Sequence, residues 1–281
     1  MSLAVQQGVR VEIVIMTQSF KKDNIDMISE WCDANIKSFP AVSNVIIRNI
    51  GGENNSEDIR SKLLNEGVKI ASSQYLAFLD DDDLMYHYAY KQLIHDLISA
   101  NAVAAFGRCV RVEGEYKGAT FHALSKSTPY NGNSIIDLIV DNFCPIHSYV
   151  LDIKAIDINE VYFDEDLPYL EDYRLLIRLM GKYKFTFLSM NESVCEYWFY
   201  QNNLNTTNKS SNRFSKEAEG WRKAYAITEK LKSETRINVS LIDIELWARN
   251  RIYNNIPNDA IIDSAYHMRG DLILSGDMFV K

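Results

Sequence analysis

The chain has 281 residues, of which 47% are hydrophobic and 24% charged, and its formal net charge is −8. This is ordinary globular composition, with enough length for a sizeable core in one large domain or in a domain with an appendage. An acidic chain without a run of Lys and Arg makes nucleic acid a poor partner. No apolar window of about twenty residues occurs and the N-terminus lacks a secretion-signal pattern, so we expect a cytoplasmic protein with no transmembrane segment.

Hydrophobic patterning in the first third of the chain predicts alternating strands and helices. Residues 11–16 form a first strand, and residues 23–37 a helix that Pro40 ends. Residues 44–48 form a second strand, and a second helix follows with Ser56 as its cap. The apolar run 75–80 is a third, buried strand. Strands separated by helices in this way indicate a parallel, Rossmann-like sheet.

The third strand ends abruptly in four acids, Asp80, Asp81, Asp82 and Asp83. Four carboxylates at one strand end repel each other unless they share a positive group. Mg²⁺ commonly binds through one or two carboxylates together with substrate phosphates, and open α/β sheets bind ligands at the carboxyl ends of their strands. The alternative is a solvated acidic turn at the N-terminus of the next helix, where carboxylates are also favoured.

The rest of the chain predicts a mixture of helices, strands and one long polar loop. We expect a helix over 84–99, strands over 102–106 and 109–112, an irregular insertion over 114–130, a short helix over 135–140 and an extended segment over 143–151. A helix begins at Glu171, and Glu171 and Asp172 in its first turn either carry chemistry or merely complement the helix dipole. Strands over 184–188 and 193–200 precede a polar loop, 201–213, which is a candidate mobile segment. Residues 214–281 have a helical pattern, with Ser240 capping a second helix.

The cysteines and histidines show no metal-binding pattern in the sequence. Cys32, Cys109, Cys144 and Cys195 form no Cys-x-x-Cys pair, and the five histidines show no ligand spacing with one another. The four cysteines are therefore interpreted as buried thiols in a reducing compartment rather than as zinc ligands or disulfides.

Three motifs in order resemble the family 2 glycosyltransferases of the GT-A fold. Asn65-x-Gly67 with Ala71 precedes the acidic strand, Asp80 and Asp82 match the family's Asp-x-Asp, and Glu171-Asp172 matches its later acidic pair. The resemblance covers about residues 11–200. It implies an α/β fold with a GT-A-like, Rossmann-type mixed sheet flanked by helices over residues 9–200, followed by the loop 201–213 and a C-terminal helical appendage over 214–281.

The resemblance also implies a role for each motif residue. Asp80 would bind the nucleotide side of a nucleotide-sugar donor, with Asp81 and Asn65 also placed at the donor. Asp82 together with Asp83 would hold Mn²⁺ or Mg²⁺ against the diphosphate. Asp172, beside Glu171, would be the general base that deprotonates an acceptor hydroxyl, and attack opposite the leaving group would invert the anomeric centre.

The nucleotide pocket is expected between the first two strands. Thr17, Gln18 and Ser19 would line it from the first strand. Where the family usually carries Asp-Asp-Gly-Ser after the second strand, this chain has Asn49-Ile50-Gly51-Gly52. Asn offers both a donor and an acceptor to a base, so Asn49 is a candidate nucleotide contact, although uracil is less assured. Leu64 stands where an Arg often precedes the motif Asn, and His147 lies either in the acceptor region or in the core.

The resulting hypothesis is a metal-dependent, inverting transferase that uses a nucleotide-sugar, with UDP as the favoured nucleotide. Its acceptor would be a carbohydrate or glycolipid in cell-surface polysaccharide or glycolipid synthesis, at the cytoplasmic face of the membrane, and the helical tail could carry a homodimer contact. A nucleotidyltransferase on a related sheet is an alternative, although the loop after the first strand lacks the glycines that usually cradle a triphosphate. The second alternative is a non-catalytic protein that binds a nucleotide-sugar.

Overall fold

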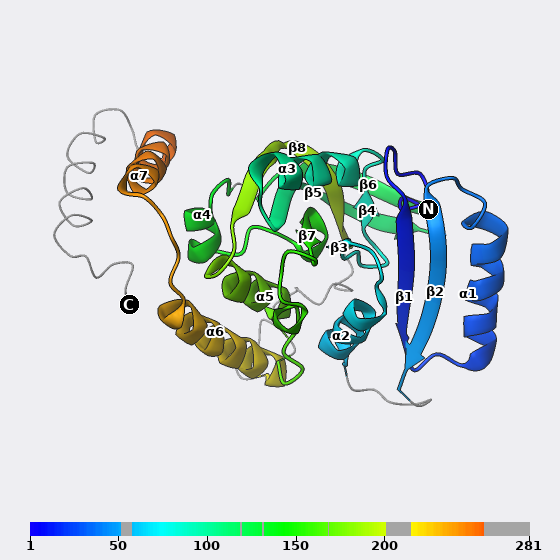
Figure 1. The fold of residues 1–281 in the computed structure, drawn as a ribbon. Helices are drawn as coiled ribbons and strands as arrows, with labels where there is room; N and C mark the ends of the chain where they lie inside the picture. Colours follow the sequence, from blue (N-terminus) through cyan, green and yellow to red (C-terminus); the bar gives the residue numbers. More distant parts are fainter. Residues whose placement is uncertain (52–57, 119, 131, 168, 201–214, 256–281) are drawn as a thin grey trace.

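A computed structural model describes residues 1–51, 58–118, 120–130, 132–167, 169–200 and 215–255 of the chain. Two separate groups of strands are flanked by helices (Figure 1). The strands are β1 Val11–Gln18, β2 Val42–Ile50, β3 Tyr75–Ala77, β4 Leu84–Met85, β5 Ala104–Lys117, β6 Thr120–Ser127, β7 Tyr149–Asp152 and β8 Phe185–Tyr200. The α-helices are α1 Lys22–Asn35, α2 Arg60–Ile70, α3 Ala89–Ala100, α4 Ile135–Val140, α5 Glu171–Met180, α6 Lys216–Glu234 and α7 Leu241–Asn255. Short 3₁₀ helices span Ile146–Ser148 and Ile158–Glu160.

The larger sheet has the order β3-β7-β5-β8-β4, and β6 pairs with β5. β5 and β8 run parallel, whereas the pairs β3–β7, β5–β7, β4–β8 and β5–β6 are antiparallel. This mixed sheet flanked by helices confirms the predicted α/β class. The predicted helices at 135–140 and from Glu171 onward are also confirmed, as α4 and α5.

The expected continuous parallel sheet through the first three strands is wrong in one respect. β1 and β2 pair in parallel as a two-stranded sheet, and β3 pairs with β7 in the larger sheet rather than with β1. A side chain joins the two parts instead, since the Glu12 carboxylate of β1 accepts the Ser72 backbone N–H at 2.8 Å and its hydroxyl at 2.9 and 3.0 Å. Helix α2 also packs on β1. A Cβ atom added at Gly67 would lie 3.4 Å from Met16 Cγ, so a side chain at this position would touch Met16.

Three segments differ from the elements that their sequence predicts. Residues 84–99 begin with β4, because Leu84 and Met85 pair with β8, and helix α3 starts only at Ala89. The acids are therefore not a cap for that helix. The predicted strand pairs 102–112 and 184–200 are each one long strand, β5 and β8, and register shifts between their paired residues interrupt the alternation that a continuous strand would show. The insertion 114–130 contains the β5–β6 hairpin.

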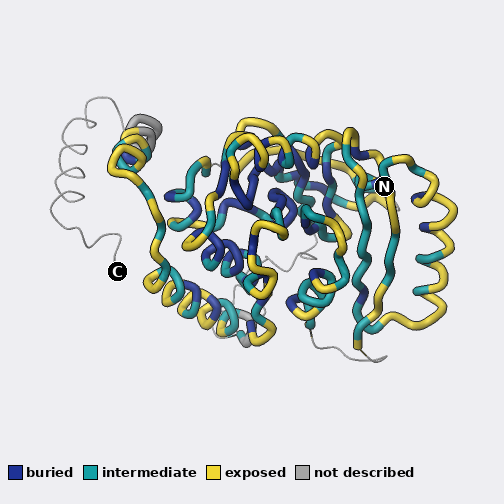
Figure 2. Tube along the Cα trace, viewed as in Figure 1, coloured by how far each residue is buried: buried dark blue, intermediate teal, exposed yellow. Residues whose placement is uncertain are grey.

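The core lies on both faces of the larger sheet. Alternate residues of β5 and β7 point to opposite sides, as the two-residue period of a strand requires. Phe106 and Tyr149 face the α5 side, and Ala105 and Val150 face the α3 side. Figure 2 shows this buried centre between exposed outer helices. The acidic segment after β3 therefore stands on a rigid, two-sided core.

The C-terminal helices α6 and α7 pack on the sheet domain. The rings of Trp221 in α6 and Tyr169 stack at 4.3 Å between centroids, and the α7 residue Trp247 donates to Asp137 Oδ1 at 2.7 Å. Ser240 caps α7 as predicted, accepting the Asp243 N–H at 3.2 Å, and Leu241, the first residue of α7, is 85% exposed. The predicted loop 201–213 lies outside the described residues. Among the described helices, none combines the length and apolarity needed to cross a bilayer.

Candidate active site

The four acids after β3 form a turn in which each carboxylate has a different environment. The Asp83 N–H donates to the Asp80 carbonyl at 3.2 Å, which closes the turn. Asp81 and Asp82 are exposed, Asp80 is half-buried, and Asp83 is buried. Burial, together with the neighbouring Asp80 carboxylate, raises the pKa of Asp82. The turn therefore concentrates negative charge on its accessible side, where a cation would relieve the repulsion.

Arg60 is the positive centre of the site. It lies in the first turn of α2, and its Nη1 and Nη2 atoms each contact an oxygen of Asp80 at 3.0 Å. Its Nε donates to Glu171 Oε1 at 2.7 Å. Burial by itself would lower the pKa of Arg60, but the two carboxylates more than offset this and raise it. One guanidinium thus joins the acids after β3 to the acids that begin α5, residues 111 positions away from Arg60 in the chain.

Sequence reasoning missed Arg60, although a signal for it was present. Arg60 precedes Leu64 by four residues, and positions four apart lie on the same face of a helix. Leu64 is the position at which the resembling family often carries an Arg. The guanidinium is therefore supplied from the same face of α2, one turn earlier than the motif suggests.

Glu171 and Asp172 begin helix α5, as predicted, and the two side chains differ in their partners. Glu171 is buried and pairs with Arg60; burial and the adjacent Asp172 charge raise its pKa to about 7, against the effect of Arg60. Asp172 is half-buried, and its Oδ1 accepts the Tyr173 N–H at 2.7 Å. Burial raises the pKa of Asp172 as well. A carboxylate with a raised pKa is a better proton acceptor than an ordinary Asp, which suits a general base.

Two strained backbone positions flank the acids. Leu170, immediately before Glu171, has φ 61°, and Ser19, just after β1, has φ 57°. A left-handed conformation is costly for a residue with a Cβ and is tolerated mainly where the surrounding structure enforces it. Among the described residues, the third non-glycine with positive φ is Asn101, an ordinary helix C-cap at the end of α3. Two of the three such residues in the described chain therefore belong to segments that the sequence predicts to form the site.

The predicted nucleotide loop lies between the ends of β1 and β2. Thr17 and Gln18 are the last residues of β1 rather than part of the loop, and they lie in register with Asn49 and Ile50 of β2. Asn49 Oδ1 accepts the Thr17 hydroxyl and the Phe20 N–H, both at 3.0 Å, and its Nδ2 donates to the Phe20 carbonyl at 2.9 Å. The Ser19 hydroxyl is buried and has no hydrogen-bond partner among the described residues. Asn49 thus shapes this loop, which encloses the Ser19 hydroxyl.

Asn65 of α2 binds the segment that leads to α5. Its Oδ1 accepts the Phe163 N–H at 2.7 Å, and its Nδ2 donates to the Phe163 carbonyl and to Glu165 Oε1, both at 2.9 Å. These bonds use the side-chain amide to fix the segment leading to α5 against α2. The motif Asn therefore sets the distance between Arg60 and Glu171 indirectly.

Asp83 differs from the expectation that it shares a metal ion with Asp82. Its side chain has no exposed surface, its Oδ1 accepts the Trp198 N–H at 3.0 Å, and its Oδ2 lies 3.1 Å from His147 Nδ1. Burial raises the pKa of Asp83 to about 7. This carboxylate points into the core, so the structure corrects its placement at the accessible metal position. His147, 2% exposed, is likewise a core residue rather than an acceptor-facing one.

The accessible acids fit a hard divalent cation. Asp82 offers an exposed carboxylate whose pKa is raised by partial burial and then by the neighbouring Asp80 carboxylate, and carboxylate oxygen is the ligand that Mg²⁺ and related cations prefer. Asp80 is already paired with Arg60, so a cation here would be held mainly by Asp82, with Asp81 next to it. Water and ligand phosphate oxygens would complete such a coordination sphere.

The model of the family described as Glycosyl transferase family 2 matches residues 10–149, a stretch that contains β1, β2 and the four acids and ends before Glu171. Among solved structures, Staphylococcus aureus TarS 1-349 in complex with UDP is similar, with a TM-score of 0.55 and 12% identity over 88% of this chain and 72% of that one. TarS 1-349 without a named ligand has a TM-score of 0.54 and 13% identity over 84% of this chain and 61% of that one. Its complex with UDP-GlcNAc has a TM-score of 0.51 and 14% identity over 89% of this chain and 75% of that one. These likenesses show a shared GT-A-like fold, and the chain covers about three fifths of the TarS 1-349 structure that has no named ligand. None of the curated proteins matches the sequence.

Proposed function

Because the chain belongs to glycosyl transferase family 2, we propose that it transfers a sugar from a nucleotide-diphosphate donor to an acceptor hydroxyl. The observation that carries this proposal is the Arg60 bridge between Asp80 and Glu171. It brings the acids after β3 and the acids of α5 into one site, where donor and acceptor chemistry can meet. A separate nucleotide site or a separate acidic turn would not need that connection.

The donor would lie across the ends of β1 and β2 and the acid turn. The end of β1 at Thr17 and Gln18, together with Ser19 in the loop that Asn49 shapes, is the proposed nucleoside position. Asp80, held by Arg60, would contact the ribose side. Two TarS structures contain UDP and UDP-GlcNAc, which supports a UDP-linked sugar as the first donor to test.

Asp82 would hold Mn²⁺ or Mg²⁺ at the donor diphosphate, with Asp81 beside it. When bound, such a cation offsets the negative charge that develops on the departing nucleoside diphosphate. Arg60 adds a fixed positive charge within the same site, so the chain supplies part of this stabilisation itself. Its guanidinium is held in place by Asp80 and Glu171, which limits the reorganisation that the reaction would require.

Asp172 is the proposed general base. It would take the proton of the acceptor hydroxyl while the acceptor oxygen bonds to the anomeric carbon and the bond from that carbon to the diphosphate oxygen breaks. Attack from the face opposite the leaving group inverts the anomeric centre. Glu171, already paired with Arg60, would position the helix start and the guanidinium rather than accept this proton.

The acceptor class and the cellular setting remain predictions. A carbohydrate or glycolipid hydroxyl is the proposed acceptor, in cell-surface polysaccharide or glycolipid synthesis at the cytoplasmic face of a membrane. A homodimer contact through α6 and α7 is a further prediction.

The test is release of nucleoside diphosphate from a panel of nucleotide-sugars with Mn²⁺, comparing the wild type with Asp172→Asn. We expect Asp172→Asn to lose about 10²–10⁴-fold in turnover, the usual contribution of a positioned base. Asp166→Asn is the matched control, because Asp166 is an exposed acid in the same acidic segment. Equal turnover by Asp172→Asn would remove the base assignment. Release of pyrophosphate from a nucleoside triphosphate would favour a nucleotidyltransferase, and donor binding without any turnover would favour a binding protein.

A further inference from the structure

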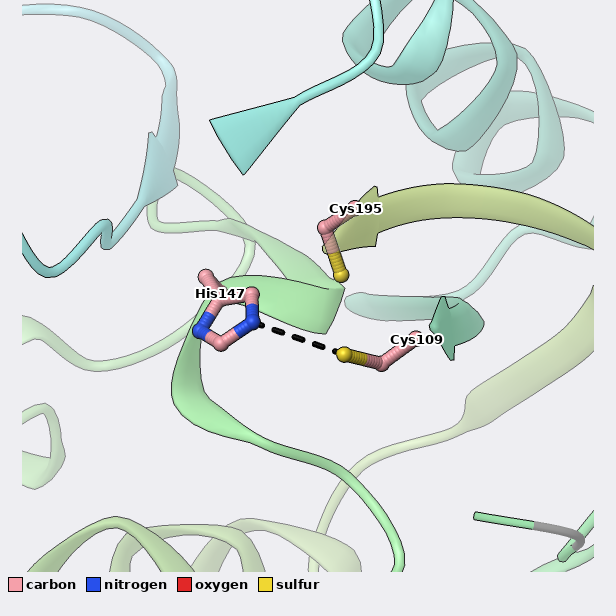
Figure 3. A group of neighbouring side chains, drawn as sticks. All are labelled: Cys109, His147 and Cys195. Carbon is pink, nitrogen blue, oxygen red and sulfur yellow. Dashed lines mark hydrogen bonds between the residues drawn. The ribbon is translucent and has the colours of Figure 1, made fainter. Parts of the chain in front are cut away.

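Three buried side chains that are far apart in the sequence meet directly behind the acid turn. Cys109 of β5, Cys195 of β8 and His147 of the 3₁₀ helix before β7 point toward one another (Figure 3). One sulfur or nitrogen atom from each lies within 4.8 Å of the other two. Cys109 and Cys195 are register partners on adjacent parallel strands, which places both thiols on the same face of the sheet. None of the three residues is more than 2% exposed.

The distances match those between the ligands of one small tetrahedral ion. Zinc binds Cys sulfur at about 2.3 Å and His nitrogen at about 2.0–2.1 Å, so two such ligands in a tetrahedral site lie about 3.6 Å apart. Cys109 Sγ and His147 Nε2 are 3.5 Å apart. Two thiolates on the same ion would lie about 3.8 Å apart, a separation that the 4.8 Å limit permits. The separations of the three ligand atoms are therefore compatible with a single shared ion.

The other ring nitrogen of His147 faces a carboxylate. His147 Nδ1 lies 3.1 Å from Asp83 Oδ2, and neither atom has a hydrogen-bond partner among the described residues. A metal-bound histidine almost always presents its second nitrogen to a carboxylate, carbonyl or water, which fixes the ring and its tautomer. A proton on Nδ1, the nitrogen nearer Asp83, would leave the lone pair of Nε2 for a ligand on the side of the thiols.

We infer that Cys109, Cys195 and His147 bind one zinc ion, with Asp83 orienting the histidine. Soft thiolate and imidazole ligands select zinc over the hard cations proposed for Asp82. Two thiolates would neutralise the charge of the Zn²⁺ ion, so the buried site would have no net charge. The thiolate, rather than the thiol, is the form of cysteine that binds a metal, so zinc binding would release the two thiol protons.

This zinc ion would be structural support for the acid turn. Asp83 is the last acid of that turn, and Met85, two residues later, pairs with Cys195. Fixing His147 and Cys195 would therefore fix the base of the turn that presents Asp82 to the donor. Sequence spacing could not reveal the site, because its ligands come from three separate elements.

The first test uses the wild-type full chain. Untagged protein, expressed with zinc in the medium, should contain about one zinc per chain by elemental analysis. After zinc removal, Co²⁺ should give a thiolate-to-cobalt charge-transfer band and the intense visible bands of tetrahedral cobalt. A folded, metal-free wild type that gives no cobalt–thiolate band would overturn the inference.

The second test uses variants with a matched control. Cys109→Ser, Cys195→Ser and His147→Gln should each lose the zinc, and Asp83→Asn should weaken zinc affinity by about 10–100-fold, as outer-sphere changes commonly do. Cys144→Ser is the control, because Cys144 is also a buried, free cysteine but lies outside the cluster. Zinc retained by the Cys109→Ser, Cys195→Ser double variant would contradict the assignment.

A third readout remains decisive if these variants do not fold. Wild-type protein is alkylated with and without a chelator, and each modified cysteine is located by mass spectrometry. We expect chelation to increase the labelling of Cys109 and Cys195 while leaving that of Cys144 unchanged. Equal labelling of all three with and without chelator, or a Cys109–Cys195 disulfide in freshly purified protein, would contradict zinc binding.

Discussion

Asp82 and Asp83 are adjacent in the chain and identical in chemistry, yet the fold places them in opposite environments. Asp82 is exposed, and partial burial together with the neighbouring Asp80 carboxylate raises its pKa. Asp83 is enclosed in the core, where it contacts the Trp198 N–H and His147. The accessible side of the acid turn thus keeps charge available for a ligand, while the enclosed side uses a carboxylate to hold the structure. Position in the turn, rather than residue type, decides the role of each acid.

The largest effect that this comparison predicts is on activity at Asp82. We expect Asp82→Asn to lower turnover by about 10²–10³-fold, a typical cost of removing one group that stabilises charge in the transition state. Its melting temperature should be equal to or above that of the wild type, since the substitution relieves repulsion with Asp80. Steady-state turnover and a thermal melt on the same preparation check the predicted activity and the predicted stability. Unchanged turnover would place the cation elsewhere.

Asp83→Asn should mainly lower stability, whereas Asp82→Asn should mainly lower activity. The Asn side chain keeps an oxygen for the Trp198 N–H but replaces the buried oxygen that faces His147 with an amide group, so we expect unfolding to become easier by about 1–3 kcal/mol. Denaturant titration measures this free energy. A variant that keeps wild-type stability and loses only activity would show that Asp83 acts at the donor after all.

The same division between the two sides of the turn explains what the sequence could predict. The exposed motif Asp80-x-Asp82 and the helix start at Glu171 follow local patterns, so their elements and their approximate neighbourhood were predictable. Arg60, the Asn49–Phe20 bonds and the Asp83–His147–Cys109 cluster depend on contacts between distant segments, which no local spacing encodes. The β5 and β8 strands were divided in the prediction because register shifts remove the alternation that marks a single strand.

The effect of burying a carboxyl group can be tested at Glu171 by measuring stability as a function of pH. Burial raises its pKa from 4.5 to about 7, so the folded state holds this proton at pH values where the unfolded chain has lost it. The resulting stabilisation is fully present below pH 4.5 and is lost as the pH rises through 7. We expect the free energy of unfolding of the ligand-free protein to be roughly 1–3 kcal/mol lower at pH 8 than at pH 5.

Glu171→Gln is the control for that pH dependence, since Gln does not titrate. The variant should lose a large part of the decrease between pH 5 and pH 8, and the part that remains should belong to Asp83, whose pKa is also raised to about 7. An identical pH profile for the wild type and Glu171→Gln would show that Glu171 is ionised throughout this range.

The smallest predicted effect concerns the strained loop after β1. Ser19→Gly removes a left-handed Cβ and a buried hydroxyl without a partner among the described residues, so we expect a gain of about 1 kcal/mol in stability. The same change should weaken donor binding several-fold if Ser19 contacts the nucleotide. Asn101→Gly is the matched control, because it alters a left-handed residue at the end of α3, away from the acids. Donor affinity lowered equally in both variants would assign the effect to general flexibility.

The most direct test of the central claim is a thermal-shift titration of nucleotide diphosphates and nucleotide-sugars, each with and without Mn²⁺, on the wild type and Asp82→Ala. A ligand present at a hundred times its Kd should stabilise the protein by about 2.7 kcal/mol. The account predicts a manganese-dependent shift with at least one nucleotide-sugar in the wild type and its loss in Asp82→Ala. A wild type that shows no shift with any donor, or an Asp82→Ala protein with the full manganese-dependent shift, would contradict it.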